Sequence, residues 1–327
     1  MQFRVGNATI TKIPELVLEL FTPTDLMPHE DPERVRQLTS GLSDVDVDHA
    51  KGVLRLSIHC WLVRTPERII LIDTGTGNEK VRSTIPVLNQ LNVPFIERLQ
   101  ANGISRHDVT DILVTHIHAD HVGWNTQLEQ GEWRPTFPKA RHYLSERETD
   151  YNAALARGDN EKVASILADA GLGEPLHPPA PEVYDDSVAP IIEAGLATTI
   201  KVDGSEPIPG FRYIATPGHS IDHASIMFEN GGERAFFWGD VLHHPLQLVA
   251  NSWNSGFCEF PNAHGVLAAE RSTWRPTQGR LSSPLTSRAV RLDMFVVTVI
   301  GMCGRPSKTI IRDLQPLLVR LATLRSG

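Results

Sequence analysis

The start of the chain alternates between short apolar segments and breaks made of Pro, Gly and Asn. The segments are rich in β-branched and aliphatic residues, a pattern typical of β-strands. They cover residues 3–5, 8–13, 54–63 and 69–72. The last of them ends in a turn, Asp73-Thr74-Gly75-Thr76-Gly77. The pattern therefore predicts that β-strands dominate the start of the chain.

Helical spacing first appears at residues 84–102, whose apolar positions recur on one face before the stop signal Asn102-Gly103. Residues 146–170 predict a polar helix at the surface, and residues 172–190, rich in Pro and acids, a loop or cap. A short buried strand is expected at 111–115, and further strands at 198–202, 211–215, 224–228 and 235–238. This succession predicts two mixed sheets faced by helices, with the site on loops at strand ends.

Composition narrows the class of protein. The 327 residues suit one large domain or two smaller ones, and 41% apolar with 21% charged residues is ordinary for a soluble globular protein. The net charge of −8 disfavours a nucleic-acid partner, because phosphate binding needs a basic surface. No apolar stretch approaches the ~20 residues that cross a bilayer. The N-terminus lacks a signal pattern, and Cys60, Cys258 and Cys303 are far apart, so we expect a cytoplasmic protein without disulfides.

The candidate chemistry begins where the strand at 111–115 ends. The run Thr115-His116-Ile117-His118-Ala119-Asp120-His121 holds four ligand-type side chains within six residues. These cannot all be core residues, because each buried polar ring would need its own partner. On a loop leaving a strand, His116 and His118 project to the same side and can hold one cation. Asp120 and His121 can reach a second, since imidazole and carboxylate are the usual ligands of Zn²⁺ and related divalent metals.

Two further segments carry candidate ligands at strand ends. In Thr216-Pro217-Gly218-His219-Ser220 the Pro-Gly turn presents His219 at its tip. In Phe237-Trp238-Gly239-Asp240 an apolar strand ends in Gly-Asp. Each signal alone is weak, because a lone turn His is often merely exposed and an Asp at a strand end is often a helix cap.

Together, in this order, the three segments resemble the metallo-β-lactamase superfamily, whose pattern is HxHxDH, then GH, then GD. The resemblance covers roughly residues 53–240. It implies an α/β fold, an αββα sandwich of the metallo-β-lactamase type, with a dinuclear metal site in the cleft at the sheet edges. The implied ligands are His116, His118 and His219 for one ion, Asp120 and His121 for the other, and Asp240 as the bridge. Asp73 matches a residue that supports a metal ligand in the family, although a turn-forming Asp explains it equally well.

The resemblance also implies the chemistry. Two divalent metal ions, expected to be Zn²⁺, lower the pKa of a shared water so that hydroxide forms near neutral pH. The metal-bound hydroxide would attack an ester or lactone, and Asp120 would orient it and take its proton, a catalytic role implied by position. Mn²⁺, Fe²⁺ and Co²⁺ accept the same ligands, so the metal stays open.

Within the superfamily, the long N-terminal segment and the Gly-Asp-Val-Leu-His-His-Pro stretch resemble the branch of acyl-homoserine lactonases and methyl parathion hydrolase. Lactonases often place a Tyr three residues after the bridging Asp to bind the substrate oxyanion, and here His243 occupies that place. His243 or His244 is a candidate hydrogen-bond donor, with packing an equal alternative for each. Trp124 either lines the substrate pocket or belongs to the core.

The end of the chain departs from the family pattern. The family expects one more metal-binding His in an Ala-His segment well after the bridging Asp, but no histidine follows His264. His264, His243 or His244 would have to complete the second site. Residues 270–327 carry 10 Lys and Arg against 3 Asp and Glu, whereas residues 1–269 have a net charge of −15. We therefore expect a hydrolase domain at 1–269 and an atypical tail at 270–327 that replaces the last part of the sandwich.

One hypothesis for the tail is that it is read out of frame relative to its relatives. Reverse translation of residues 271–290 with GC-rich codons, shifted by a single base, permits an Ala-His segment near residues 285–286. The gene sequence decides this, and a genuinely divergent tail is the alternative.

The first functional hypothesis is a metal-dependent hydrolase of esters or lactones, with a small-molecule substrate and neither nucleic acid nor membrane as partner. The alternative within enzymes is a thioester hydrolase like glyoxalase II, which needs a basic glutathione site near the C-terminus. A third hypothesis is a metal-binding protein whose catalysis is impaired because the last His ligand is missing. A homodimer is left open by the resemblance.

Overall fold

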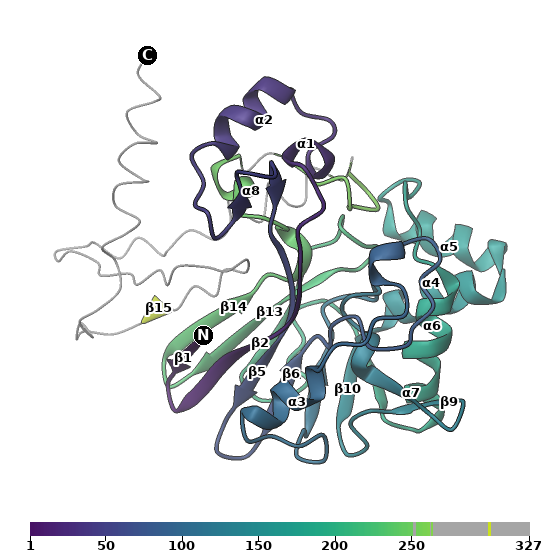
Figure 1. Cartoon of the computed structure of the whole chain (residues 1–327). Helices are drawn as coiled ribbons and strands as arrows, with labels where there is room; N and C mark the ends of the chain where they lie inside the picture. Colours follow the sequence, from purple (N-terminus) through teal and green to yellow (C-terminus); the bar gives the residue numbers. More distant parts are fainter. Residues whose placement is uncertain (251–252, 262, 264–299, 302–327) are drawn as a thin grey trace, which may run out of the picture.

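The computed structural model describes residues 1–250, 253–261, 263 and 300–301. The main body of this part of the chain consists of two sheets, with helices over the outer face of one (Figure 1). Apart from residues 300–301, the expected tail lies outside the described residues. The first sheet has seven strands in the spatial order β1-β2-β5-β6-β7-β10-β11. Their bounds are β1 Gln2–Val5, β2 Ala8–Leu18, β5 Leu56–Arg64, β6 Ile69–Ile72, β7 Asp111–Leu113, β10 Arg141–Ser145 and β11 Ala197–Ile200.

The first sheet is mixed. Its strands are antiparallel from β1 to β6 and parallel from β6 to β11. The second sheet contains β12 (Phe211–Ala215), β13 (Ala224–Asn230), β14 (Glu233–Phe237) and β15 (Ile300–Gly301), and all its described pairings are antiparallel. The expectation of two mixed sheets is therefore wrong for the described strands of the second sheet. Short connections join β12 to β13 and β13 to β14, and short connections favour antiparallel pairing.

Four helices of the main body pack against the outer face of the seven-stranded sheet, α3 (Phe95–Ala101), α4 (Glu146–Arg157), α6 (Pro181–Ser187) and α7 (Ala189–Glu193). A fifth helix, α5 (Asn160–Ala170), packs on α4. The predicted α/β architecture with two stacked sheets is confirmed.

Three helix predictions need correction. The single helix expected at 84–102 is wrong: residues Pro86–Leu88 form a 3₁₀ turn (η1), and α3 begins only after Pro94. The two prolines lack the backbone N–H that a continuous helix needs. The helix expected at 146–170 is divided at Gly158, which adopts φ +66° and ends α4. Residues 172–190 contain α6 rather than loop alone.

The core lies on both faces of the first sheet. Along β5, Trp61 and Val63 face the second sheet, whereas Cys60 and Leu62 face the helices. Successive side chains of a strand point to opposite faces. Since both faces of β5 are covered, its sequence is nearly continuous in apolar residues instead of alternating.

A separate small cluster stands at the top of the view in Figure 1. There α1 (Pro23–Leu26), α2 (Pro32–Thr39) and α8 (Leu246–Val249) pack with the hairpin of β3 (Val47–Asp48) and β4 (Val53–Leu54). The remaining elements are the hairpin β8 (Thr126–Glu129) and β9 (Glu132–Pro135), and the short turns η2 (Gly123–Asn125) and η3 (Gly239–Val241). Among the described residues, no helix has the length and apolar character of a membrane span. Cys60 and Cys258 are free and buried.

Candidate metal centre

The histidine run follows β7 directly, at the carboxyl end of a strand with parallel neighbours on both sides. Thr115 donates twice to the carboxylate of Asp73, from its backbone N–H to Oδ1 and from its hydroxyl to Oδ2, each across 2.8 Å. Asp73 follows β6 and turns the chain with φ +56°. Its Oδ2 also lies 2.9 Å from Nδ1 of His121. Asp73 therefore contacts both ends of the run. It supports the histidine loop in addition to turning the chain.

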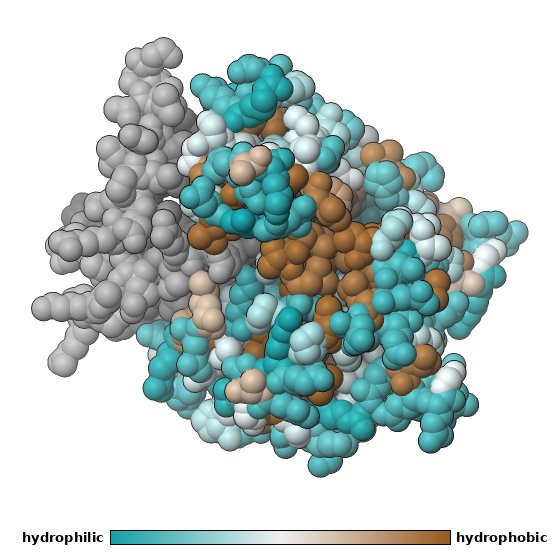
Figure 2. All heavy atoms as spheres, in the orientation of Figure 1, coloured by the Kyte–Doolittle hydropathy of each residue, from teal (hydrophilic) through white to brown (hydrophobic). Residues whose placement is uncertain are grey.

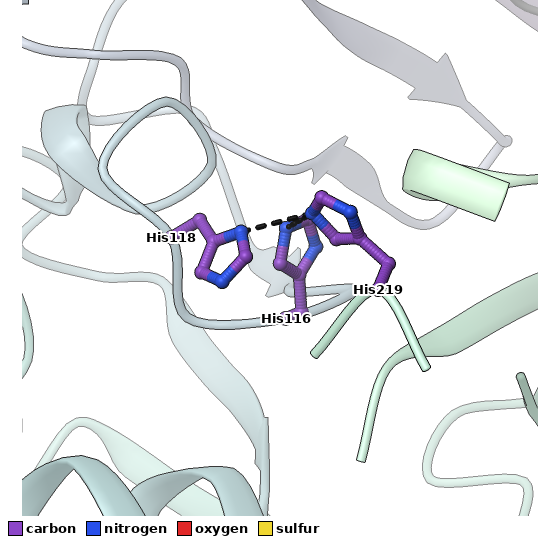
Figure 3. A group of neighbouring side chains, drawn as sticks. All are labelled: His116, His118 and His219. Atoms are coloured by element: carbon purple, nitrogen blue, oxygen red, sulfur yellow. Dashed lines mark hydrogen bonds between the residues drawn. The ribbon is translucent and has the colours of Figure 1, made fainter. Parts of the chain in front are cut away.

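Three imidazole rings from two loops point toward one another (Figure 3). Nε2 of His219 lies 3.1 Å from Nε2 of His116 and 2.9 Å from Nδ1 of His118. His116 and His118 share the loop after β7, and His219 comes from the turn after β12. His116 and His219 are buried, and the His118 side chain is 16% exposed. The structure thus brings together the three side chains that the sequence analysis assigned to one ion.

This set of donors fits a cation. A neutral imidazole has a single N–H, so hydrogen bonds among three converging nitrogens cannot satisfy all of them. A tetrahedral Zn²⁺ with Zn–N distances of about 2.0–2.1 Å would set its nitrogen ligands roughly 3.3 Å apart, close to these separations. Burial lowers the pKa of both His116 and His219 well below the usual value, which leaves ring lone pairs available for a metal.

The carboxylate of Asp240 lies among three imidazole rings. Its Oδ2 is 3.3 Å from Nε2 of His121, 3.4 Å from Nε2 of His219 and 3.4 Å from Nε2 of His243. Burial alone raises the pKa of Asp240, but the three imidazoles outweigh it and hold the pKa well below its usual value. Three overlapping groups could hold a metal ion: His116 with His118 and His219, His116 with His121 and Asp240, and His219 with Asp240 and His243.

Asp120 is the predicted site residue that stands furthest from these groups. Its Oδ2 lies 3.8 Å from Nε2 of His121, and its side chain is 32% exposed. Among the described residues, it belongs to none of the three groups. Asp120 nevertheless lines the cavity over the cluster, so its carboxylate faces the space that a substrate or water would enter.

His223, a residue that sequence reasoning missed, holds the backbone of Asp240. Its Nε2 accepts a hydrogen bond from the Asp240 N–H across 2.8 Å, and its Nδ1 lies 2.8 Å from the hydroxyl of Thr216. Burial lowers the pKa of His223 to about 3, so the ring is neutral. Gly239, with φ +57°, makes room for this contact, since a Cβ there would lie 2.5 Å from Nε2 of His223. A polar ring directly before the apolar segment 224–228 was the available signal.

Two buried carboxylates beside the histidine loop were also missed, because neither belongs to the three motifs. Glu148 of α4 accepts hydrogen bonds from the backbone N–H of Ile117 at 3.2 Å and of Asp222 at 2.8 Å. Oε1 of Glu259 lies 2.6 Å from Nε2 of His118. Burial raises the pKa of both glutamates, and for Glu259 the hydrogen bond to His118 opposes that rise. The loop is thus contacted by negative charge from two separate elements.

A cavity of about 820 Å³ opens onto the cluster, and His118, His121 and Asp240 are among its lining residues. Its walls are mostly apolar and include Leu18, Phe21, Ile58, Ile85, Val87 and Val183. Figure 2 shows apolar residues gathered in the middle of one face of the molecule, next to the α1–α2 pair. Residues 176–183 also line the cavity, so the segment predicted as a loop or cap does contribute to its wall.

The comparison with protein families decides where this site belongs. The family model of the metallo-β-lactamase superfamily matches residues 53–286, more than half of the chain. The chain belongs to the metallo-β-lactamase superfamily. It is a hydrolase of that superfamily.

Individual relatives share 26% sequence identity or less with the chain in the comparisons that follow. The chain is 26% identical over 278 residues to the acyl-coenzyme A thioesterase MBLAC2 of Homo sapiens. The alignment covers 82% of this chain and 88% of that protein. Among solved structures, the hydrolase AbOPH aligns with a TM-score of 0.63 at 22% identity, covering 93% of this chain and 98% of that one. The dizinc quorum-quenching lactonase AidC aligns with a TM-score of 0.64 at 18% identity, covering 94% and 98%. These structures support the fold.

For this member of the superfamily, the structure distinguishes between the roles that the sequence left open for the aromatic residues and histidines near the site. Trp124 is buried, stacks on Phe95 and donates its indole N–H to Glu15, and it does not line the cavity. Both ring nitrogens of His244 contact backbone, at Asp46 and at the N–H of Leu246, so this ring is used in packing. His243 lines the cavity. His264 lies outside the described residues.

Proposed function

We propose that this chain hydrolyses uncharged esters or lactones at a centre of two divalent metal ions, Zn²⁺ in the first instance. The proposed ligands are His116, His118 and His219 for the first ion, His121 and Asp120 for the second, and Asp240 between them. The convergence of the first three rings supports the first ion, and the position of Asp240 between His121 and His219 supports the bridge. The second ion rests on the weaker placement of Asp120.

The residues that line the cavity support the proposal of an uncharged substrate. Apart from histidines, the one cationic side chain in its described lining is Arg82. That guanidinium is 1% exposed and makes two hydrogen bonds to the carboxylate of Asp186, at 2.7 and 3.0 Å. The described wall therefore offers no free cation to phosphates or carboxylates of a substrate, whereas its apolar side chains suit an uncharged group with a hydrocarbon chain.

Bound at this site, two divalent ions would supply hydroxide near neutral pH and polarise the substrate carbonyl. The side chains of the protein would do the rest. Asp120, with a partly exposed carboxylate beside His121, is placed to orient the attacking water and accept its proton. Nε2 of His243 is buried, has no hydrogen-bond partner in the described part of the chain, and faces Asp240. His243 would serve as a hydrogen-bond donor to the substrate oxygen.

His243 does not take the place of the missing last ligand in this arrangement. Its Nε2 groups with His219 and Asp240, on the side of the first ion. The second ion would therefore have Asp120, His121 and Asp240 from the described residues. We retain residues 1–269 as the proposed hydrolase domain, with β15 as the described part of the tail that pairs with β14.

The likeness to the acyl-coenzyme A thioesterase MBLAC2 supports thioester hydrolysis as a second candidate. A thioester carbonyl could be attacked at the same centre. Coenzyme A and glutathione are both anionic, however, and the described lining holds no unpaired Lys or Arg to bind them. Uncharged esters and lactones therefore rank first.

The test combines metal analysis with a substrate panel. Purified protein is dialysed and its metal content per folded chain measured, and the panel contains uncharged esters and lactones beside S-lactoylglutathione and acyl-coenzyme A thioesters. His219→Ala removes a proposed ligand, and His107→Ala, at an exposed position, is the matched control. We expect about two ions per chain, turnover of the uncharged substrates, and loss of both in His219→Ala alone.

Other outcomes have distinct meanings. Turnover of the charged thioesters without any lactone or ester would establish the second candidate instead. One ion per chain without turnover would identify a metal-binding protein with impaired catalysis. A folded protein that takes up no metal would overturn the proposal.

A further inference from the structure

The segment 253–261 contacts two of the proposed ligand histidines, His118 and His219, although it carries none of the motifs. Its backbone pairs with the loop of His219: the N–H of Glu259 donates to the His219 carbonyl across 2.9 Å, and the N–H of Phe260 donates to the Gly218 carbonyl across 3.0 Å. The carbonyl of Glu259 accepts from the N–H of Leu176 at 2.7 Å. Three backbone hydrogen bonds therefore fix the position of Glu259 without using its side chain.

The side chain of Glu259 points at a ligand ring. Its Oε1 lies 2.6 Å from Nε2 of His118, and the residue is 1% exposed. The other nitrogen of this ring, Nδ1, is the atom that faces His219 in Figure 3. A neutral imidazole carries one proton, and a carboxylate can only accept it. Glu259 thus keeps the proton on Nε2 and leaves the lone pair of Nδ1 directed into the cluster.

The same arrangement occurs once on each side of the centre. Asp73 contacts the outer nitrogen of His121, and Glu259 contacts the outer nitrogen of His118. The outer nitrogen of His116 contacts the neutral hydroxyl of Thr115 instead. Each proposed ion would therefore be bound by one imidazole that is made more basic by a carboxylate.

Glu259 is otherwise costly to bury. A carboxylate removed from water destabilises the fold unless a positive group compensates it. In the described part of the chain, the His118 ring is the one side chain that contacts the Glu259 carboxylate as an ion-pair partner would, yet as a neutral ring it carries no charge, and Oε2 has no hydrogen-bond partner. A nearby metal ion would provide the compensating charge.

We propose that Glu259 is a positioning residue for the metal ligand His118: it fixes the tautomer and orientation of the ring and raises the affinity of the first ion. This inference rests on the proposed metal centre, and it adds to that centre a residue from a segment outside the motifs.

The test compares Glu259→Gln and Glu259→Ala with the wild type and with Glu15→Gln. Glu15 is a buried carboxylate that accepts hydrogen bonds from Thr76, Gly77 and Trp124 and touches no ligand ring in the described structure, so it controls for the loss of any buried charge. The readouts are the dissociation constants of Zn²⁺ and Co²⁺ by chelator competition, the absorption spectrum of the Co²⁺ form, and the urea stability of the metal-free protein.

We expect Glu259→Ala to weaken the binding of the first ion by about 10–100-fold and to shift the Co²⁺ spectrum. Glu259→Gln keeps an acceptor oxygen, so its loss should be smaller, and it preserves the test if the alanine variant fails to fold. Glu15→Gln should lower stability and leave metal affinity and spectrum unchanged. Wild-type affinity and spectrum in both Glu259 variants would overturn the inference while leaving the metal centre standing. A wild-type protein that binds no metal would overturn both.

Discussion

The backbone N–H of Asp240 donates to Nε2 of His223 across 2.8 Å, so a buried neutral histidine sets the position of the proposed bridging carboxylate. The ring is itself held by the hydroxyl of Thr216. This contact joins the start of β13 to the turn after β14, two adjacent strands of the second sheet. The bridging position therefore depends on a residue that would not ligate the metal.

Replacing His223 tests this dependence. His223→Ala leaves the Asp240 N–H without its acceptor and takes one partner from the Thr216 hydroxyl, which keeps its contact with Ser225. We expect it to destabilise the protein by about 1–3 kcal/mol. Because Asp240 loses its backbone support, metal affinity should fall as well. His142→Ala, which removes another fully buried histidine in β10, is the control. It should lower the free energy of unfolding and leave metal affinity unchanged. Equal metal affinity in all three proteins would contradict the role of His223.

The turn at Gly239 gives a second test. Gly239→Ala places an L-residue at φ +57° and its Cβ 2.5 Å from Nε2 of His223. Gly158→Ala is the matched control, because φ is +66° and a Cβ there meets no atom within 4 Å. The control should cost about 1–2 kcal/mol from backbone conformation alone. Gly239→Ala should cost clearly more and should also weaken metal binding, as measured by urea unfolding and chelator competition. Equal losses in the two variants would show that the contact with His223 is unimportant.

The lowered pKa of Lys80 should make the free energy of unfolding depend on pH. Burial lowers the pKa of Lys80 to about 7, although Asp186 opposes the shift. Between about pH 7 and the usual value of 10.5 the unfolded chain binds a proton that the folded chain does not. The contribution of Lys80 to stability therefore rises with pH across this window, by up to about 1.4 kcal/mol per pH unit.

Lys80→Met isolates this effect, since Arg82 still pairs with Asp186 in the variant. Urea unfolding of both proteins at several pH values from neutral upward gives the difference in free energy of unfolding, wild type minus variant. We expect that difference to increase with pH. A difference that stays constant would mean that Lys80 does not titrate in this window.

Two of the buried tryptophans, Trp124 and Trp61, should behave differently. Trp124→Phe removes a hydrogen-bond donor to the buried carboxylate of Glu15, so it should destabilise the protein by about 1–3 kcal/mol. It should leave KM for the best uncharged substrate unchanged, because Trp124 does not line the cavity. Trp61→Phe is the comparison, since Trp61 does line the cavity and should change KM. A raised KM in Trp124→Phe would place this ring at the substrate after all.

Sequence patterns predicted the elements well where local signals agree. The strands expected at 69–72 and 211–215 match β6 and β12 residue for residue. The helix expected at 84–102 is broken at Pro86 and Pro94, and two of its apolar positions, Ile85 and Leu88, line the cavity instead of extending a helical face. Apolar spacing alone does not distinguish a residue facing a core from one facing a substrate cavity.

The sequence by itself determined the chemistry of the loop after β7. Its ligand-type side chains lie within six residues, so their proximity follows from chain connectivity, and the order of the three motifs indicated the family. Only the tertiary structure decided the partners of these side chains. Asp73 contacts His121, His223 holds Asp240 and Glu259 contacts His118, across 48, 17 and 141 residues of sequence. Such pairs arise where strands and loops from distant parts of the chain pack together, and hydrophobic burial, which drives that packing, leaves no local pattern at the polar residues it brings into contact.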